Sequence, residues 1–471
     1  MAWWRTSKRA AGASRTQSKF HTESACIIIG AGHVGLSVAR GLRALGIEPI
    51  IIEQHSRIGD SWRYRYERLH LHHVTDAMHL PGVKYPEHVP RYLSRLDLAD
   101  YLEGYALLHG LDVRLDHRVL ALQHDAAEGW TLTVERAGSQ VTFTADHVVL
   151  AAGATGITPC VPELAGRDTW LGRILHSKQY VNADTFRGEQ VLVVGSGNSA
   201  IEIIYDLHDH EAKPAMLMRG GNSWVTREGF AYYHRVLIMG AVLLKYVPFV
   251  WLLAPLVMRG LDRFFMFDVK RRYGDLNAFG VETDPTPPML RMAKSAGAQA
   301  PSYVDGTWGD VGVALFDLIR DGHVAIFKTE IDHLAPDGKT VVFTDGQQVE
   351  FDSIILCTGF EPVMSHYATF VESNIMQAIS QRGLQPWQEV PGYAGLWPAL
   401  GGIATSRYGL QVLARRIAAR IRGRALPRRV LNPVVSFVLA GPDPGLIQVP
   451  RRTIAINVLA VVGLLLVFST D

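Results

Sequence analysis

Two short glycine-rich turns constrain the fold of this chain more than any other feature of its sequence. The first turn, Gly30–Gly35, reads GAGHVG and follows the apolar run Cys26–Ile29. The second turn, Gly195–Ala200, reads GSGNSA and follows the apolar run Val191–Val194. Each turn leads into a segment with apolar residues at helical spacing. A buried strand, a GxGxxG or GxGxxA turn and a helix together form the start of a dinucleotide-binding βαβ unit.

Each glycine of the first turn has a separate task. Gly30 permits a tight turn, Gly32 lets the backbone approach a pyrophosphate, and Gly35 lets the helix pack closely on the strand. The following helix presents unpaired N–H groups and the positive end of its dipole to the phosphates. The corresponding candidates in the second turn are Gly195, Gly197, Asn198, Ser199 and Ala200. We therefore expect two pyrophosphate sites.

The residue at the end of the second strand of each unit predicts which dinucleotide binds there. In the first unit it is Glu53, whose carboxylate can accept both ribose hydroxyls of an adenosine. In the second unit it is Arg219, which can pair with a 2′-phosphate, although a surface arginine without that role is the alternative. Two dinucleotides on one chain imply that electrons pass between them. The natural pairing is FAD as the tightly bound acceptor and NADPH as the hydride donor.

These units predict an α/β protein with two Rossmann-like dinucleotide-binding domains, the NADPH domain being inserted into the FAD domain. We expect the FAD domain over residues 25–165 and 346–425, and the NADPH domain over residues 166–345. Apolar periodicity predicts helices over 33–46, 97–109, 198–209 and 407–422. Short strands are expected over 111–151 and 323–356.

Two tails and one insertion lie outside this scheme. The basic tail, residues 1–24, is expected to be flexible, with a transit peptide as the alternative. Residues 236–258 are apolar and interrupted by prolines, and residues 454–468 of the C-terminal tail (426–471) are too short to span a bilayer comfortably. Either segment would contact a membrane surface or pack as ordinary core. We expect a cytoplasmic protein, with or without such peripheral contact.

Composition excludes several classes of function. Lys and Arg number 47 against 45 Asp and Glu in 471 residues, so no basic excess indicates nucleic-acid binding. The cysteines, Cys26, Cys160 and Cys357, lie far apart, which excludes a disulfide scaffold and any CxxC motif. Histidines cluster over residues 70–79, but no cysteine or acid completes a ligand set. We therefore expect no metal site.

Further motifs resemble those of the class B flavin-dependent monooxygenases, which carry separate FAD and NADPH domains. This group includes the microsomal-type flavin-containing monooxygenases, the plant YUCCA-type enzymes and the Baeyer–Villiger monooxygenases. Trp170–Tyr180 resembles the linker motif FxGxxxHxxxY of the group, with Trp in place of Phe. Gly59–Trp62 resembles its flavin-contacting GGxW segment, with Asp in place of the second Gly. Cys357–Phe360 resembles the ATG(Y/F) segment that ends the NADPH domain, and Ala151–Gly153 resembles an earlier copy of it.

The resemblance spans about residues 25–425 and implies additional site residues. The linker histidine, His176, would position the domains and the nicotinamide or act in catalysis directly, and His72 would lie near the flavin. The segments Arg68–His72 and Pro86–Pro90 look closest to the YUCCA-type pattern. The remaining implied cofactor-binding residues are Ser61, Trp62, Ala152, Gly153, Thr358 and Gly359.

The resemblance also implies an activity. NADPH would reduce FAD, O2 would add at the flavin C4a atom, and the resulting (hydro)peroxyflavin would oxygenate a small organic substrate. The substrate classes of the group are aromatic 2-oxo acids, nitrogen or sulfur nucleophiles, and ketones. The first alternative is a flavin reductase that passes electrons from NADPH to a quinone or a protein carrier. The second is a non-catalytic redox-sensing or membrane-docking protein, against which the two intact turns argue.

Overall fold

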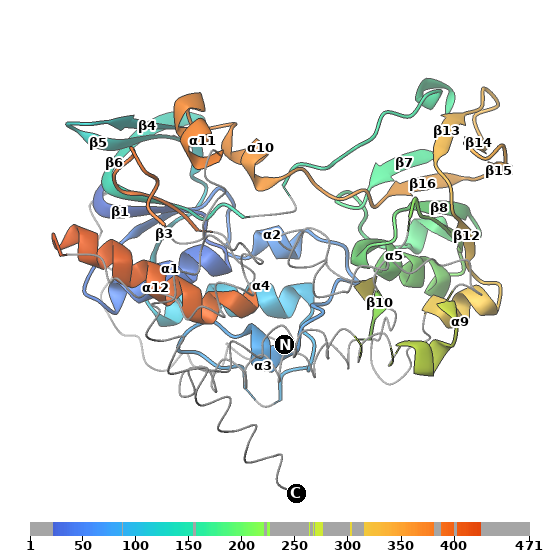
Figure 1. Ribbon diagram of the computed structural model, residues 1–471, viewed down its shortest axis with the longest axis horizontal. Coiled ribbons are helices and arrows are strands. Elements are labelled where there is room, and N and C mark those ends of the chain that lie inside the picture. Colours follow the sequence, from blue (N-terminus) through green and yellow to red (C-terminus); the bar gives the residue numbers. More distant parts are fainter. Residues whose placement is uncertain are drawn as a thin grey trace, which may run out of the picture. The chain divides into compact units, whose positions relative to one another are not determined.

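The computed structural model describes most of the chain and resolves it into two compact units (Figure 1). The described residues are 22–86, 88–153, 157–220, 224–226, 263, 267, 269–276, 302–303, 315–380, 388–399 and 403–424. The first unit contains those up to Pro162, the segment His176–Val181, and those from Thr358 onward. The second unit contains Glu163–Leu175 and those within Asn182–Cys357.

The first unit is built on a sheet in the order β3-β2-β1-β6-β5-β4, and β17 also pairs with β6. Strands β3, β2, β1, β6 and β17 run parallel, whereas β5 and β4 continue the sheet as an antiparallel meander. Their bounds are β1 Glu23–Ile29, β2 Ile50–Ile52, β3 Asp112–Arg114, β4 Arg118–Asp125, β5 Gly129–Arg136, β6 Ser139–Leu150 and β17 Leu396–Pro398. Strand β2 and the second half of β1 are apolar and buried on both faces, as expected when helices cover them.

The helices of the first unit are α1 His33–Arg43, α2 Asp60–Arg63, α3 Thr75–Met78, α4 Arg95–Leu108, α10 Val363–Tyr367, α11 Ser373–Ser380 and α12 Ile403–Ile421. Helix α4 starts at a capping box, in which Ser94 and Asp97 exchange hydrogen bonds. Helix α12 lies so close to α1 that a Cβ atom at Gly41 would stand 2.7 Å from the Cβ atom of Ala414. Helices α10 and α11 cover the meander with a core that includes Trp130, Phe143 and Tyr367.

The second unit contains a parallel sheet and a small antiparallel sheet. The five-stranded sheet has the order β12-β9-β8-β16-β7, and the three-stranded sheet has the order β13-β14-β15. The strands are β7 Arg173–His176, β8 Gln190–Val194, β9 Lys213–Leu217, β12 Ala325–Phe327, β13 Ile331–Leu334, β14 Thr340–Phe343, β15 Gln348–Glu350 and β16 Ser353–Leu356, with the short pair β10 Trp224–Val225 and β11 Ser302–Tyr303. The helices are α5 Asn198–Asp209 and α9 Leu315–Arg320.

Two segments of the first unit, which we call the crossing segments, adjoin the points where the chain changes unit. They comprise residues 157–160 and 358–361 and pair antiparallel through the bridge between Pro159 and Phe360. The Cys160 N–H donates to the Gly359 carbonyl at 3.0 Å, and the Glu361 N–H donates to the Thr158 carbonyl at 2.9 Å. The two connections are therefore fastened to each other within the first unit.

The comparison with the sequence confirms both βαβ units and corrects two boundaries. The helix predicted over 198–209 is α5 itself. The expected flexible tail, 1–24, is two residues too long, because Glu23 and Ser24 pair with β6 as part of β1. The return to the FAD domain, expected at 346, is too early, because β16 pairs with β8 and the first unit resumes at Thr358. Residues 1–21, 236–258 and 454–468 lie outside the described residues, and no helix among the described ones is long and apolar enough to cross a membrane.

Candidate functional site

The first glycine turn joins β1 to α1 and has the close packing that its sequence predicts. Gly30 has φ +106°, and a Cβ atom there would stand 2.5 Å from the Ala151 carbonyl oxygen. A Cβ atom at Gly35 would stand 1.9 Å from the Gly30 carbonyl oxygen. At Gly32, by contrast, a Cβ atom would meet no atom of the described residues within 4 Å. Gly30 and Gly35 are thus required by packing, whereas Gly32 faces open space in front of the helix.

Glu53 follows β2 and reaches across to this turn. Its Oε2 accepts the Ala31 N–H at 2.8 Å, and its Oε1 accepts the His55 N–H at 3.0 Å and lies 2.6 Å from His55 Nδ1. Burial acts to raise the pKa of Glu53, but these hydrogen bonds outweigh it and the pKa is lowered. The bond with Glu53 in turn raises the pKa of His55. The carboxylate is therefore ionised and held beside the glycine turn.

The segment Gly59–Trp62 shows why aspartate replaces the second glycine of the related motif. Gly59 has φ +89°, and a Cβ atom there would stand 2.7 Å from the Cα atom of Ala99, so this position requires glycine. Asp60 instead starts α2 and is buried, and its carboxylate accepts the Arg57 N–H at 3.1 Å and pairs with Arg63 at 3.3 Å. Ser61 is exposed and Trp62 is half-buried.

The second glycine turn joins β8 to α5 and repeats the geometry of the first. Gly195 has φ +131°, and a Cβ atom there would stand 2.6 Å from the Cys357 carbonyl oxygen. Its N–H donates to the Leu217 carbonyl at 2.8 Å, as the Gly30 N–H does to Ile52 in the first turn. Gly197 precedes α5 and is open to solvent, Asn198 and Ser199 form the first turn of the helix, and Ala200 is fully buried. The structure thus brings these five predicted residues together.

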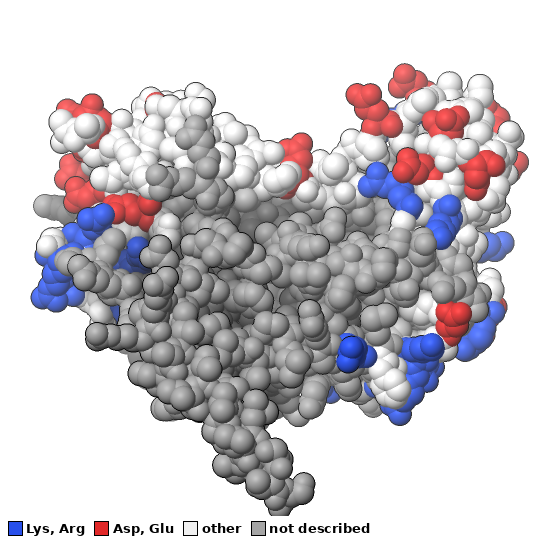
Figure 2. Space-filling view, in the orientation of Figure 1, with Lys and Arg blue, Asp and Glu red and all other residues white. Residues whose placement is uncertain are grey.

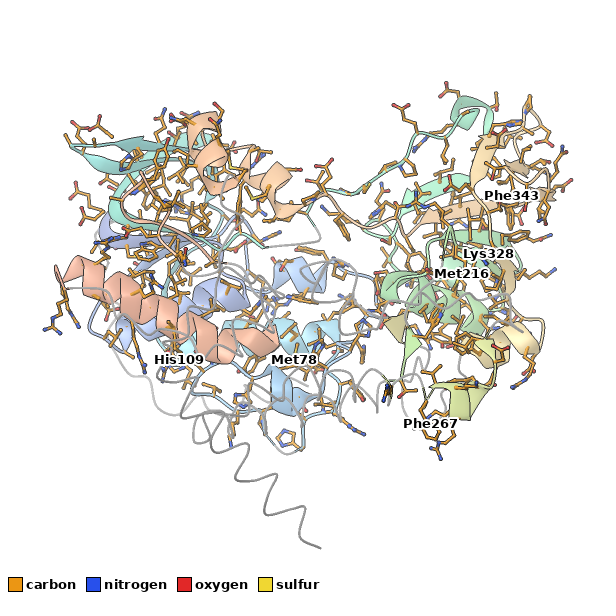
Figure 3. All side chains as sticks on the ribbon, in the orientation of Figure 1. Met78, His109, Met216, Phe267, Lys328 and Phe343 are labelled. Atoms are coloured by element: carbon orange, nitrogen blue, oxygen red, sulfur yellow. The ribbon has the colours of Figure 1, made fainter. Side chains whose placement is uncertain are left out.

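Arg219 is exposed and follows β9, at the same edge of the sheet as the second glycine turn. Strand β12 runs parallel to β9 with Phe327 beside Leu217, and the Met218 N–H donates to the Phe327 carbonyl at 2.9 Å. Lys328, the exposed residue after Phe327 (Figure 3), therefore follows its strand at the same edge of the sheet as Arg219. Sequence reasoning missed Lys328. Its signal is a lysine directly after a short apolar run.

Acidic side chains occupy a different part of the second unit. Figure 2 shows them gathered over strands β13–β15, where Asp332, Asp337, Asp345 and Glu350 are exposed. A phosphate would be repelled by this surface. The cations Arg219 and Lys328 instead follow neighbouring strands at the edge of the parallel sheet that holds the glycine turn.

The linker histidine, His176, belongs to the first unit and is buried. Its Nδ1 accepts the Lys178 N–H at 3.1 Å, and its Nε2 lies 2.9 Å from the Gly359 carbonyl oxygen. A backbone N–H can only donate and a carbonyl can only accept, so these partners require the neutral tautomer with the proton on Nε2. Burial lowers the pKa of His176, and the charges of Arg65 and Lys178 lower it further against the opposing bond to Gly359.

The remaining predicted residues divide between the two glycine turns and the linker histidine. Ala152 and Gly153 follow β6, where a Cβ atom at Gly30 would contact Ala152. Thr358 donates to the Cys160 carbonyl within the paired crossing segments, next to Gly359. His72 lies half-buried in the bend before α3. Among the described residues, no group of histidines, cysteines and acids could hold a metal ion.

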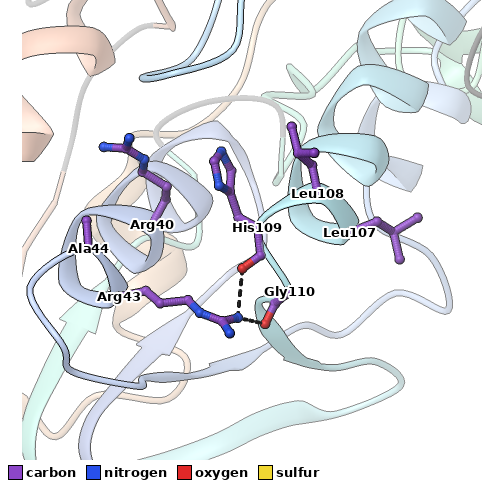
Figure 4. A pocket seen from close by; sticks show the side chains of 7 residues that line it. All are labelled: Arg40, Arg43, Ala44, Leu107, Leu108, His109 and Gly110. Carbon is purple, nitrogen blue, oxygen red and sulfur yellow. Dashed lines mark hydrogen bonds between the residues drawn. The ribbon is translucent and has the colours of Figure 1, made fainter. Parts of the chain in front are cut away.

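A hollow of about 480 Å³ in the first unit contains none of the predicted site residues (Figure 4). It lies between the ends of α1 and α4 and is lined by Arg40, Arg43, Ala44, Leu107, Leu108, His109 and Gly110. Arg43 donates to the carbonyls of His109 and Gly110, the former at 2.7 Å. The arginine thereby satisfies the carbonyls that follow α4, which is a structural role.

Comparison with known proteins places the chain in a family. Residues 27–232 match the family model described as pyridine nucleotide-disulphide oxidoreductase. The chain is 32% identical over 336 residues to the indole-3-pyruvate monooxygenase YUCCA1 of Oryza sativa subsp. japonica. The aligned region covers 71% of this chain and 76% of the relative. The chain belongs to the class B flavin-dependent monooxygenases. As a member of that family, it is an NADPH-dependent flavin monooxygenase that uses O2 and a small-molecule substrate.

A second relative agrees with this membership, and two solved structures share the fold. The monooxygenase is 29% identical over 410 residues to YUCCA8 of Oryza sativa subsp. indica, covering 84% of this chain and 90% of the relative. Its fold matches OTEMO in complex with FAD and NADP, with a TM-score of 0.62, 16% identity and coverage of 85% of this chain and 86% of the other. The fold also matches a flavin-containing monooxygenase from Stenotrophomonas maltophilia, with a TM-score of 0.58 and 18% identity. This match covers 84% of this chain and 99% of the other. These likenesses confirm the predicted fold with two Rossmann-like domains.

The disulphide chemistry in the name of the family model does not extend to the cysteines of this monooxygenase. All three cysteines are free, and none is near another along the chain. Cys26 is buried within β1, and burial raises the pKa of its thiol to about 12. A thiol that stays protonated is a poor nucleophile. The match therefore reflects the two dinucleotide-binding units.

Proposed function

We propose that this monooxygenase holds FAD at the first glycine turn and NADPH at the second, and that it oxidises an aromatic 2-oxo acid with O2. The observation that carries the proposal is the repeated turn, followed by an acid in one unit and by two cations in the other. The first unit would then be the FAD domain and the second the NADPH domain.

The residues of the first turn fit the adenosine diphosphate part of FAD. Gly32 is the N-cap residue of α1 and has no side chain to accept the N–H groups of the first helical turn. The open space in front of it would admit a pyrophosphate, which those N–H groups and the helix dipole would stabilise. Glu53 is ionised and fixed by His55 and Ala31, and its remaining lone pairs would accept the ribose hydroxyls. Ser61, Trp62, Ala152 and Gly153 would complete the site.

The residues of the second turn fit NADPH rather than NADH. Gly197 stands before α5 as Gly32 stands before α1, so the second pyrophosphate would lie against the same kind of helix start. Arg219 and Lys328, at the ends of neighbouring parallel strands, would pair with the 2′-phosphate. An acid at either position would repel it.

His176 would act as a positioning residue rather than as an acid or base. Both of its ring nitrogens are engaged by backbone groups, and burial keeps the ring neutral. Its bond to Gly359 ties the linker motif to a crossing segment, where Thr358 and Gly359 would contact a cofactor. The ring would therefore fix the backbone geometry beside the cofactors. FAD, when bound, would supply hydride acceptance from NADPH and the activation of O2.

The aromatic 2-oxo acid is supported by the relatives, several of which are named as indole-3-pyruvate monooxygenases. Phenylpyruvate is a simple probe of this class. An oxidative decarboxylation would release CO2 and leave phenylacetate, with one oxygen atom of O2 in the new carboxylate and the other in water. Thioanisole, a neutral sulfur nucleophile, tests the other substrate class of the family.

The decisive experiment is anaerobic reduction of the purified yellow protein with NADPH, followed by addition of O2 with and without phenylpyruvate. We expect an absorbing species that differs from both oxidised and reduced flavin and that decays faster when phenylpyruvate is present. Labelled phenylacetate should form from ¹⁸O2. Immediate return to oxidised flavin, with release of one hydrogen peroxide per NADPH, would overturn the proposal and favour a reductase that serves a quinone or a protein carrier.

A further inference from the structure

Arg65 carries a guanidinium group that the described part of the protein does not pair with an anion. Its backbone N–H donates to the Trp62 carbonyl at 3.1 Å, which places the residue just after α2. The side chain is half-buried, and its Nε atom is covered by protein without a hydrogen-bond partner. No ion pair or side-chain hydrogen bond joins Arg65 to any residue that the structure describes.

The surroundings of Arg65 combine three of the motifs that sequence analysis singled out. The guanidinium carbon lies 5.4 Å from the centre of the Phe360 ring, in the segment that resembles ATG(Y/F). The other contact of that ring is His176 of the linker motif, at 5.1 Å between ring centres and nearly perpendicular. The carbonyl of Trp62, in the segment that resembles GGxW, accepts the backbone N–H of Arg65. Arg65 thus stands where these three motifs meet within the first unit.

The electrostatic balance at this place is positive. Arg65 and Lys178 are the two charges that act on His176, and both lower its pKa. Lys178 is exposed and donates from Nζ to the Ile157 carbonyl, whereas the guanidinium of Arg65 lies over the ring of Phe360. A cation–π contact is a weak partner for a half-buried cation, because an aromatic ring face supplies no acceptor for the covered Nε–H group. Carboxylates and phosphates are the groups that satisfy a guanidinium through two parallel hydrogen bonds.

We propose that Arg65 is a specificity-determining residue that binds the carboxylate of the substrate. This inference rests on the proposed function, which assigns the phosphates of FAD and NADPH to the two glycine turns and leaves the carboxylate of the 2-oxo acid as the anion without a partner. The planar guanidinium, supported on one face by Phe360, presents its edge to that carboxylate. Removal of Arg65 therefore weakens binding of acidic substrates and leaves neutral ones unaffected.

The test compares Arg65→Met and Arg65→Lys with the wild-type holoenzyme. For Arg65→Met we expect KM for phenylpyruvate to rise about 10- to 100-fold, the range of a lost charge-assisted hydrogen-bonded pair. Arg65→Lys should recover part of this loss, because it keeps the charge but not the fork geometry. KM for NADPH and the rate of thioanisole oxidation should not change. Phenylacetate, titrated against the flavin absorbance, should lose affinity by the same factor as phenylpyruvate.

Arg57→Met is the matched control, because Arg57 is exposed and pairs with Glu103 at 2.7 Å. It should leave every parameter unchanged, and FAD content and Tm should show that all variants fold. Equal losses for phenylpyruvate and thioanisole, a raised KM for NADPH, or unchanged phenylacetate binding would each overturn the role of Arg65. The phenylacetate titration needs no turnover, so it still decides the role of Arg65 if the proposed oxygenation fails.

Discussion

Replacing Gly35 or Gly32 by alanine separates two reasons for glycine in the first turn. At Gly35 the new Cβ atom would stand 1.9 Å from the Gly30 carbonyl oxygen, whereas ordinary contacts begin at 3.4 Å. At Gly32 no described atom lies within 4 Å of the new Cβ atom, and φ is −76°, which suits alanine. The first substitution therefore disturbs the protein itself, and the second can disturb only what binds in front of the helix.

The sizes of the two effects follow from these distances. Gly35→Ala must move α1 away from β1 by about 1.5 Å or distort the turn, and overpacking of this kind costs about 1–3 kcal/mol or more. Gly32→Ala costs the free protein little, but it places a methyl group where the pyrophosphate would approach. If the overlap of this methyl group with FAD costs a similar free energy to the overpacking at Gly35, FAD binding weakens by about 10- to 100-fold.

The assay measures Tm and FAD affinity for both variants after removal of the flavin. Gly35→Ala should lower the Tm of the flavin-free protein by several degrees and abolish tight FAD binding. Gly32→Ala should keep the wild-type Tm and lose FAD affinity alone. Ala200→Gly provides the control, because alanine is native at the matching position of the second turn and is fully buried there. Its FAD affinity should equal that of the wild type.

Two outcomes would refute this reasoning. Wild-type FAD affinity in Gly32→Ala would mean that no pyrophosphate approaches this turn. A wild-type Tm in Gly35→Ala would mean that the close contact with Gly30 does not limit the packing of α1 on β1.

Charge reversal of Arg219 or Lys328 to glutamate should raise KM for NADPH by about 10- to 100-fold and hardly change KM for NADH, and equal changes in steady-state assays would disprove 2′-phosphate recognition. His55→Gln should destabilise the flavin-free protein most between pH 4.5 and 6.5, the ordinary pKa values of the two partners. The stability that His55 contributes is lost as pH rises through its raised pKa, and the stability that Glu53 contributes is lost as pH falls through its lowered pKa. A difference in thermal unfolding that does not vary with pH would contradict the ion pair between Glu53 and His55. His176→Gln should increase the fraction of NADPH lost to hydrogen peroxide without moving the pH profile of NADPH oxidation, whereas a shifted profile would indicate an acid–base role.

The sequence predicted the parts of the site that depend on local pattern. The glycine turns, the helices after them and Glu53 are recognisable because strand, turn and helix follow one another within a few residues. The same holds for Arg219, which stands two residues after the end of β9.

The remaining features depend on which distant segments become neighbours, and hydrophobic periodicity carries no information about that. Lys328 reaches the same sheet edge as Arg219 because β12 pairs with β9. Arg65 meets Phe360 and His176 because three separated motifs converge. The two misplaced boundaries have the same origin, since β1 extends to match the long β6 and β16 joins the sheet of β8.

The pairing of residues 157–160 with 358–361 has an evolutionary consequence. Antiparallel partners stand about 5 Å apart, so the first unit presents two adjacent attachment points for whatever is inserted between them. A foreign module whose own ends lie close together could be grafted there without displacing a strand of the host sheet. The segment His176–Val181 is the one part of the insert that such an exchange would have to preserve, because it is built into the host through His176 and the buried Tyr180. Lineages that swap the inserted module while keeping this short peptide would retain a complete first unit.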